Sequence, residues 1–104
     1  MLIVVSYDIK DDRRRMRVHK ILKDYGQWMQ YSVFECRIDR STYLRLRARL
    51  EEVINLAAGD SVCFYFLREE DAGRIERLGG GKPLSEVAVF VGFDGDEKEK
   101  VFDK

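Results

Sequence analysis

The chain has 104 residues, enough for one domain that buries roughly two-thirds of its unfolded surface on folding. Its 19 basic and 19 acidic residues balance, which excludes a strongly basic protein, and its hydrophobic share of 45% is sufficient for a core. No run approaches the roughly 18 apolar residues of a membrane span, and the first residues do not resemble a signal peptide, so we expect a cytoplasmic protein.

The first third of the sequence predicts a strand, a helix and a second strand. Residues 2–7 are too apolar for an edge strand and indicate a central one. Asp11 or Asp12 is placed to cap a helix that Gly26 ends. The apolar stripe of this helix comprises Val18, Ile21, Leu22 and Tyr25. Residues 27–38 then alternate in polarity, which predicts one long strand.

The middle of the sequence predicts a second helix and two further strands. The helix begins at Asp39 or Ser41 and ends at Gly59. Its buried face is expected to carry Tyr43, Leu46, Leu50, Val53, Ile54 and Ala57. Residues 61–67 are apolar on both faces and predict a central strand, and residues 74–78 predict one more after an acidic turn. Residues 1–78 therefore indicate an α+β domain, a ferredoxin-like βαββαβ sandwich with two helices on one face of an antiparallel sheet.

The last quarter of the sequence exceeds what this fold requires. Residues 79–85, which include three consecutive glycines and a proline, predict a hinge. Residues 86–93 predict an extra strand, which we expect to be exchanged in a homodimer by pairing with the partner's sheet. Residues 94–104 are mostly charged and predict a flexible tail.

The charge of the chain is unevenly distributed although its sum is zero. Residues 10–24 carry seven basic side chains against three acidic ones, and residues 37–49 carry five arginines against Asp39 alone. Such segregation is compatible with a basic face for phosphates, and equally with ordinary solvated helix surfaces.

Asp8 is the candidate residue for chemistry, because it ends the first strand just before the arginines 13–15. A carboxylate at the rim of a sheet can hold Mg²⁺ against a phosphodiester while arginines bind the neighbouring phosphates. The alternative is that Asp8 caps a turn or pairs with an arginine. One carboxylate is also few for a metal site, unless a symmetry-related chain supplies a second.

The other candidate residues have simpler interpretations. Ser32 and Phe34 share one face of a predicted strand, where they could contact a nucleotide or, for Phe34, fill the core. His19 is the only histidine and is expected at the surface, and Trp28 and Tyr31 are expected in the core or an interface. The separation of Cys36 and Cys63 fits neither a disulfide framework nor a metal site, so both are expected to be reduced packing residues.

Taken together, these segments resemble the small CRISPR-associated adaptation subunit, the endoribonuclease family Cas2. The resemblance rests on residues 5–9 (VSYDI), the arginines 13 and 14, residues 25–26 (YG) and residues 30–35 (QYSVFE), and it covers about residues 2–92. It implies a ferredoxin-like homodimer in which the final strand of each subunit pairs with the other.

The resemblance also implies roles for individual residues. Asp8 falls on the metal-associated aspartate of the family, and two copies of Asp8 in the dimer would hold Mg²⁺ or another divalent cation for phosphodiester hydrolysis. Arg14 and Arg15 would bind the phosphate, Ser32 and Phe34 would shape the site, and nucleic acid would contact a set comprising Arg13, Arg14, Arg15, Arg17, Ser32 and Phe34.

Several functions follow from the resemblance. The first is an endonuclease that acts on single-stranded RNA, duplex DNA or both during CRISPR adaptation. The second is a non-catalytic scaffold that grips duplex DNA through arginines and bridges dimers of the Cas integrase subunit. A stand-alone toxin-type mRNA interferase and, from the fold alone, a regulatory module for a small molecule remain as alternatives.

Overall fold

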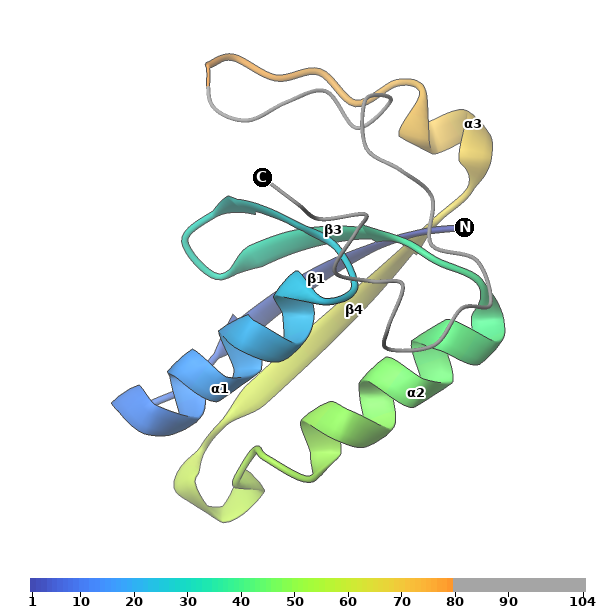
Figure 1. The fold of residues 1–104 in the computed structure, drawn as a ribbon. Helices are drawn as coiled ribbons and strands as arrows, with labels where there is room; N and C mark the ends of the chain where they lie inside the picture. The colour runs from blue at the N-terminus through green and yellow to red at the C-terminus, as the bar shows by residue number, and fades with distance from the viewer. Residues whose placement is uncertain (80–104) are drawn as a thin grey trace.

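The computed structural model describes residues 1–79, whose elements follow one another in the order of a ferredoxin-like domain (Figure 1). The elements are β1 (Leu2–Asp8), α1 (Asp12–Lys23), β2 (Gln27–Gln30), β3 (Val33–Arg37), α2 (Arg40–Glu51), the 3₁₀ helix η1 (Leu56–Ala58), β4 (Ser61–Leu67) and α3 (Glu69–Ala72). The predicted α+β class and ferredoxin-like βαββαβ fold are confirmed, although the strands and helices predicted one by one ran in the order β-α-β-α-β-β. Asp11 and Asp39 cap the two long helices, since their side chains accept hydrogen bonds from the backbone N–H groups of Arg14 and Thr42.

The four strands form one sheet in the order β2-β3-β1-β4, in which every neighbouring pair is antiparallel. β1 is central, as predicted: Ile3 lies opposite Cys36 of β3 and opposite Phe66 of β4. The prediction that residues 61–67 form a central strand is wrong, because β4 lies at an edge of the described sheet. Its apolar outward residues, including Cys63 and Tyr65, are exposed, so Cys63 is not a core packing residue.

The predicted single strand over residues 27–38 is also wrong, because the chain reverses at Tyr31 and Ser32 to form the β2–β3 hairpin. Tyr31 adopts a positive φ of 46°, and its carbonyl accepts a hydrogen bond of 2.8 Å from the indole of Trp28. The hairpin supplies the fourth strand of the sheet, which the sequence predicts at residues 74–78 instead. Those residues are not a strand in the structure, and α3 occupies the position of the predicted acidic turn.

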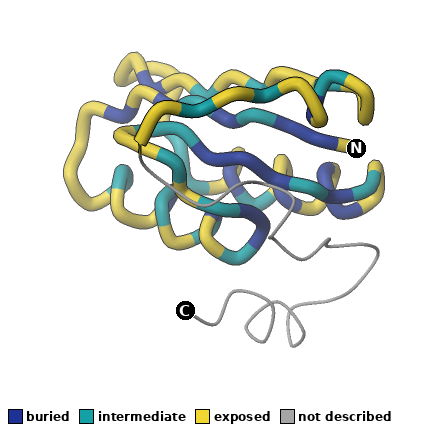
Figure 2. The backbone as a smooth tube through the Cα atoms, turned by 90° about the horizontal axis from the view of Figure 1, so that it is seen from above, coloured by how far each residue is buried: buried dark blue, intermediate teal, exposed yellow. Residues whose placement is uncertain are grey.

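Both long helices pack on the same face of the sheet, where the main core lies between the layers (Figures 1 and 2). Ile3, Val5 and Tyr7 of β1 point into this core, and Val18 and Leu22 of α1 cover them. Further core residues from α2 are Tyr43, Leu46 and Leu50. The second helix ends at Glu51 rather than near Gly59, which leaves the predicted core residue Ala57 exposed in η1.

Gly26 lies just after α1 but does not end the helix, contrary to what its position in the sequence predicts. It lacks the positive φ of a helix-ending glycine, and Asp24 forms the C-cap of α1. A Cβ on Gly26 would lie only 2.5 Å from the carbonyl oxygen of Glu35 and closer still to the Sγ of Cys36. Gly26 is therefore required for the close approach of the chain to β3.

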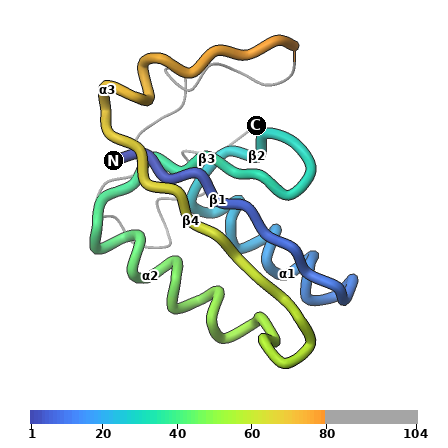
Figure 3. The backbone as a smooth tube through the Cα atoms, turned by 180° about the vertical axis from the view of Figure 1, so that it is seen from behind, coloured from blue at the N-terminus to red at the C-terminus, as the bar shows by residue number. Residues whose placement is uncertain are grey.

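The opposite face of the sheet is covered by neither long helix, and Figure 3 is drawn from that side. We call it the open face. It presents Val4, Ser6 and Asp8 of β1, and their neighbours on the flanking strands are Val33, Glu35, Ser61, Cys63 and Tyr65. Val4, Ser6 and Val33 are half-buried, and Tyr65 is 53% exposed. At one end, Leu2 and Ala72 form a second small core with Leu67 and Ile75.

Within residues 1–79, every helix is too short or too polar to cross a membrane. Apart from Gly79, the predicted hinge at 79–85 lies outside the described residues. The strand predicted at 86–93 and the tail predicted at 94–104 lie outside them as well.

Candidate nucleic-acid interface

Asp8 is the last residue of β1 and lies on the open face, opposite Ser61 of β4. Its side chain is 70% exposed, and its Oδ2 atom is 3.5 Å from the ammonium of Lys10. No group of three or more acidic, histidine or cysteine side chains that could hold a metal ion lies around it or elsewhere in residues 1–79. One chain, as described, therefore presents an accessible carboxylate and not a complete set of metal ligands.

Arg14 is held by an acidic residue that the sequence did not single out. Asp60 is buried and accepts hydrogen bonds from Arg14 Nε at 2.7 Å and from the backbone N–H groups of Asn55 and Lys10 at 2.9 and 3.3 Å. The hydrogen bond from Arg14 lowers the pKa of the Asp60 carboxyl to about 2, and the same pair raises the pKa of Arg14. Arg14 thus ties α1 to the loops beside Asp8, and its guanidinium is largely occupied by Asp60. A buried aspartate after Gly59 gave no sequence signal, since its partner is 46 residues away.

The remaining arginines of α1 fall into two groups. Arg15 is half-buried, donates to the carbonyl of Ile9 at 3.1 Å and is paired with Asp12. Arg13 and Arg17 are exposed and form no ion pair with another residue of the described chain. Of the four arginines predicted to bind nucleic acid, Arg13 and Arg17 are therefore the two whose charge is not already balanced by a neighbour within residues 1–79.

Phe34 lies in the core and not on an accessible strand face, so the prediction that it contacts nucleic acid does not agree with the structure. It has no exposed surface, and its ring packs edge-on against His19 with 5.1 Å between ring centroids. Ser32 is half-buried in the hairpin turn, and its carbonyl accepts the N–H of Tyr7. It does not form a surface with Phe34.

His19 is half-buried, contrary to the surface position predicted for it. Its Nδ1 lies 3.2 Å from the hydroxyl of Tyr7, and its ring also packs against Trp28. Burial lowers the pKa of this imidazole, with a smaller contribution from the nearby charge of Lys23. His19 is therefore a packing residue between α1 and the sheet.

The structure concentrates positive charge on the helix layer, which we define as α1 and α2 together. α1 carries six basic residues against one acidic residue, and α2 carries four against one. The other residues of the 1–79 segment carry five basic and eleven acidic side chains. A chain without net charge thus has one basic layer and an acidic remainder, which is the distribution that attracts phosphates to one side of a protein.

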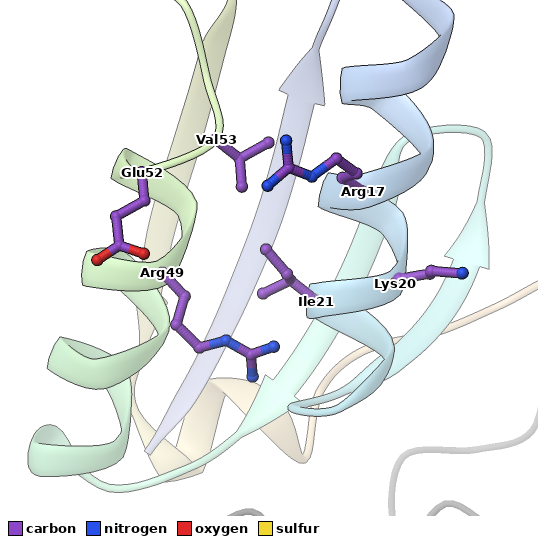
Figure 4. Close-up of a pocket in the computed structure, with 6 residues that line it drawn as sticks. All are labelled: Arg17, Lys20, Ile21, Arg49, Glu52 and Val53. Carbon is purple, nitrogen blue, oxygen red and sulfur yellow. The ribbon is translucent and has the colours of Figure 1, made fainter.

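A shallow groove of about 340 Å³ runs along this layer between α1 and α2 (Figure 4). We call it the α1–α2 groove. Its lining residues are Arg17, Lys20, Ile21, Arg49, Glu52 and Val53. The sequence indicated that the two segments were basic, but only the antiparallel packing of the helices places Arg17 and Arg49 on one groove.

The antiparallel four-stranded sheet with both long helices on one face defines the class of the protein, a ferredoxin-like domain. Within that class the chain belongs to the Cas2 family, since the sequence model described as CRISPR associated protein Cas2 matches residues 1–75. The resemblance seen in the sequence motifs is confirmed.

Individual relatives agree with this assignment. The "CRISPR-associated endoribonuclease Cas2" of Thermus thermophilus is 43% identical over 79 residues, which are 76% of this chain and 83% of the relative. The crystal structure of Streptococcus pyogenes Cas2 at pH 6.5 has a TM-score of 0.66 at 34% identity and covers 76% of this chain and 100% of that one. A chain of a partial Cas6-RT-Cas1–Cas2 complex shares the fold, with a TM-score of 0.65 at 20% identity over 83% of this chain and 98% of that one.

Proposed function

We propose that the protein is a nucleic-acid-binding homodimer of CRISPR adaptation that cleaves phosphodiester bonds with Mg²⁺ or a similar divalent cation held at Asp8. The observation that carries the proposal is the basic helix layer on a chain with no net charge. Phosphates of single-stranded RNA or duplex DNA would contact this layer through Arg13 and Arg17, without reading the sequence of bases.

Dimerisation is proposed to occur through the open face and the β4 edge. The open face exposes Cys63 and Tyr65 of β4 beside the half-buried Val4 and Val33, an apolar strip that Ser6 interrupts and that neither long helix covers. A second copy would bury that strip, and the strand predicted at residues 86–93 would add to the partner's sheet edge. This arrangement would also bring two copies of Asp8 toward one axis.

The dimer is necessary for the proposed chemistry because residues 1–79 of one chain do not supply a set of metal ligands. Carboxylate oxygens are the ligands that Mg²⁺ prefers, and the exposed side chain of Asp8 is accessible to such an ion. The chemistry that such an ion supplies is a bound water of lowered pKa and an offset for charge on the phosphate. Asp8 and its symmetry mate would hold the ion, Lys10 would attract the phosphate, and Arg14 would keep the strand end in place through Asp60.

A non-catalytic scaffold is the second candidate, and two observations favour it. Asp8 belongs to no group of three potential metal ligands within residues 1–79, and Arg14 is bound to Asp60 rather than available to a phosphate. In this alternative the dimer holds duplex DNA between subunits of a Cas integrase. The integrase partner is supported by membership of the family and by the Cas1–Cas2 complex that contains the same fold.

An Asp8→Asn substitution tests the proposed function. It removes the negative charge but keeps the size of an exposed side chain, so the variant should fold normally and bind nucleic acid normally. We expect Mg²⁺-dependent cleavage of labelled single-stranded RNA and duplex DNA to be lost. Cleavage that persists at the wild-type rate contradicts the proposed mechanism. Loss of cleavage together with normal spacer acquisition by the integrase would assign the biological role to the scaffold.

The proposed interface is tested by Tyr65→Glu, with Leu44→Glu on α2 as the matched control. The two side chains are similarly exposed, at 53% and 48%, but only Tyr65 lies on the open face. Sedimentation equilibrium should find monomers for Tyr65→Glu and dimers for Leu44→Glu. Deletion of residues 84–104 should also weaken the dimer, and an unchanged dimer in both experiments contradicts this interface.

A further inference from the structure

We propose that the α1–α2 groove binds the phosphate of a single nucleotide unit, either a free nucleotide or the end of a single strand, with its phosphate between Arg17 and Arg49. This inference goes beyond the proposed function because it depends on neither Asp8 nor the dimer. It rests on the side chains that line the groove and on the directions in which they point.

The charged groups of the groove are arranged for an anion. In Figure 4 the guanidinium groups of Arg17 and Arg49 extend from opposite helices into the gap, whereas the carboxylate of Glu52 points away from it. Arg17 has no ion-pair partner in the described chain, and the charge of Arg49 is offset only by a long contact of 3.4 Å with the partly exposed Asp24. A phosphate between the two guanidinium groups would offset their repulsion and accept charge-assisted hydrogen bonds from both sides.

Arg49 is already oriented by its neighbours. Its Nη1 donates to Asp24 at 3.4 Å and to the hydroxyl of Tyr25 at 3.3 Å, and its Cζ lies 5.5 Å from the centre of the Tyr25 ring. Less side-chain freedom is therefore lost when Arg49 binds a ligand than for an unrestrained arginine. A guanidinium carries five N–H donors, so these contacts are compatible with further bonds to phosphate oxygens.

The size and the lining of the groove favour one nucleotide rather than a duplex. Its volume of about 340 Å³ is at the lower end of the range for small-molecule sites. Ile21 lies between the two arginines and Val53 lies beside the end of Arg17, so the groove also offers an apolar surface for a base or sugar. Packed helices are only about 8–10 Å apart between axes, which is too narrow for double-stranded nucleic acid.

The inference is tested by titration of the full chain with adenosine monophosphate, followed by methyl NMR. Saturable shifts of the Ile21 and Val53 methyl groups are expected. Arg17→Gln should weaken binding about tenfold, since a charge-assisted bond is lost. Arg40→Gln is the matched control, because Arg40 is an exposed arginine of the helix layer but does not line the groove. A thermal melt of both variants confirms that they are folded.

The outcomes separate the possible sources of the phosphate. Binding of the mononucleotide but not of a 5′-phosphorylated tetranucleotide assigns the groove to free nucleotides, and tighter binding of the tetranucleotide assigns it to strand ends. Absence of methyl shifts, equal weakening in Arg17→Gln and Arg40→Gln, or inorganic phosphate binding as tightly as the nucleotide overturns the inference. If duplex binding and cleavage fail while mononucleotide binding persists, the proposed function is wrong and the groove assignment stands.

Discussion

Replacing Gly26 by alanine should strongly destabilise the fold, because β3 passes so close to this glycine. The new Cβ would lie 2.5 Å from the Glu35 carbonyl oxygen, whereas ordinary contacts begin at 3.4 Å. The chain must open by about 1 Å at a place that also contains the buried Sγ of Cys36. We expect a loss of about 1–3 kcal/mol in the free energy of unfolding, since overpacking of cores has this cost.

Urea unfolding followed by the fluorescence of Trp28 measures this loss, because Trp28 is the only tryptophan and lies on β2 next to the site. The corresponding fall in Tm is about 4–8 °C for each kcal/mol. Gly73→Ala is the control: its Cβ would come no closer than 3.8 Å to another atom, and its φ is negative. It should leave stability unchanged or raise it by up to about 1 kcal/mol.

A double-mutant cycle identifies the cause of the loss. Cys36→Ala removes the sulfur that the new Cβ would meet, so it should relieve part of the strain in Gly26→Ala, with a coupling of about 0.5–3 kcal/mol. The account is contradicted if Gly26→Ala is as stable as Gly73→Ala. Strictly additive effects of the two substitutions at Gly26 and Cys36 would show that the sulfur is not what the Cβ meets.

Three further predictions concern Asp60, Phe34 and Asp8. Because Arg14 lowers the folded-state pKa of Asp60 to about 2, below the unfolded value of about 3.9, its stabilisation is complete above about pH 4 and is lost as pH falls through 2. Asp60→Asn should therefore be less stable at neutral pH, with a Tm that depends less on pH between 4 and 2; parallel curves for both proteins would refute the role of this carboxylate. Phe34→Leu should lower the Tm, since a buried ring and its contact with His19 are lost, while the affinity of the folded protein for RNA stays unchanged. Weaker RNA binding by a variant that is folded to the same extent as wild type would show that Phe34 contacts the RNA. Asp8→Asn should change the free energy of unfolding by no more than about 0.5 kcal/mol, because the only described partner of Asp8 is an exposed lysine at 3.5 Å. A large loss of stability would make Asp8 a structural residue.

The fold class was predictable because it depends on local periodicity and on caps. The apolar run of residues 2–7 predicts β1. Apolar spacing together with an aspartate at the N-cap, Asp11 or Asp39, predicts α1 and α2. The hairpin was not predictable from local signals. Tyr31 reverses the chain in a left-handed conformation without a glycine, asparagine or proline, and a side-chain hydrogen bond from Trp28 accompanies the turn.

The position of β4 shows a second limit of sequence patterns. Residues 61–67 are apolar on both faces, which normally indicates a central strand, yet the strand lies at an edge with Tyr65 and Cys63 exposed. The apolar pattern would be explained if a second copy covers the open face, as the proposed dimer requires.

The positions of the candidate site residues were predictable only in part. The exposure of Asp8 at the end of β1 agrees with its predicted position, and Arg13 and Arg17 are exposed on the basic helix. The positions of Arg14 and Phe34 depend instead on contacts between residues far apart in the sequence, since Asp60 binds Arg14 and Phe34 packs against His19 of α1. Neither contact has a local pattern, because each joins elements that meet only in the folded domain.

The central claim, that the basic helix layer holds nucleic acid by its backbone, is tested most directly by a salt titration. The affinity of the full-length protein for a duplex DNA and for a single-stranded RNA is measured from low to physiological salt, beside an Arg13→Gln/Arg17→Gln double variant. Wild-type affinity should fall steeply with salt, and the slope of the double variant should be smaller by about two. Binding that barely depends on salt, or an unchanged slope in the variant, would contradict the claim and favour a module for a small molecule.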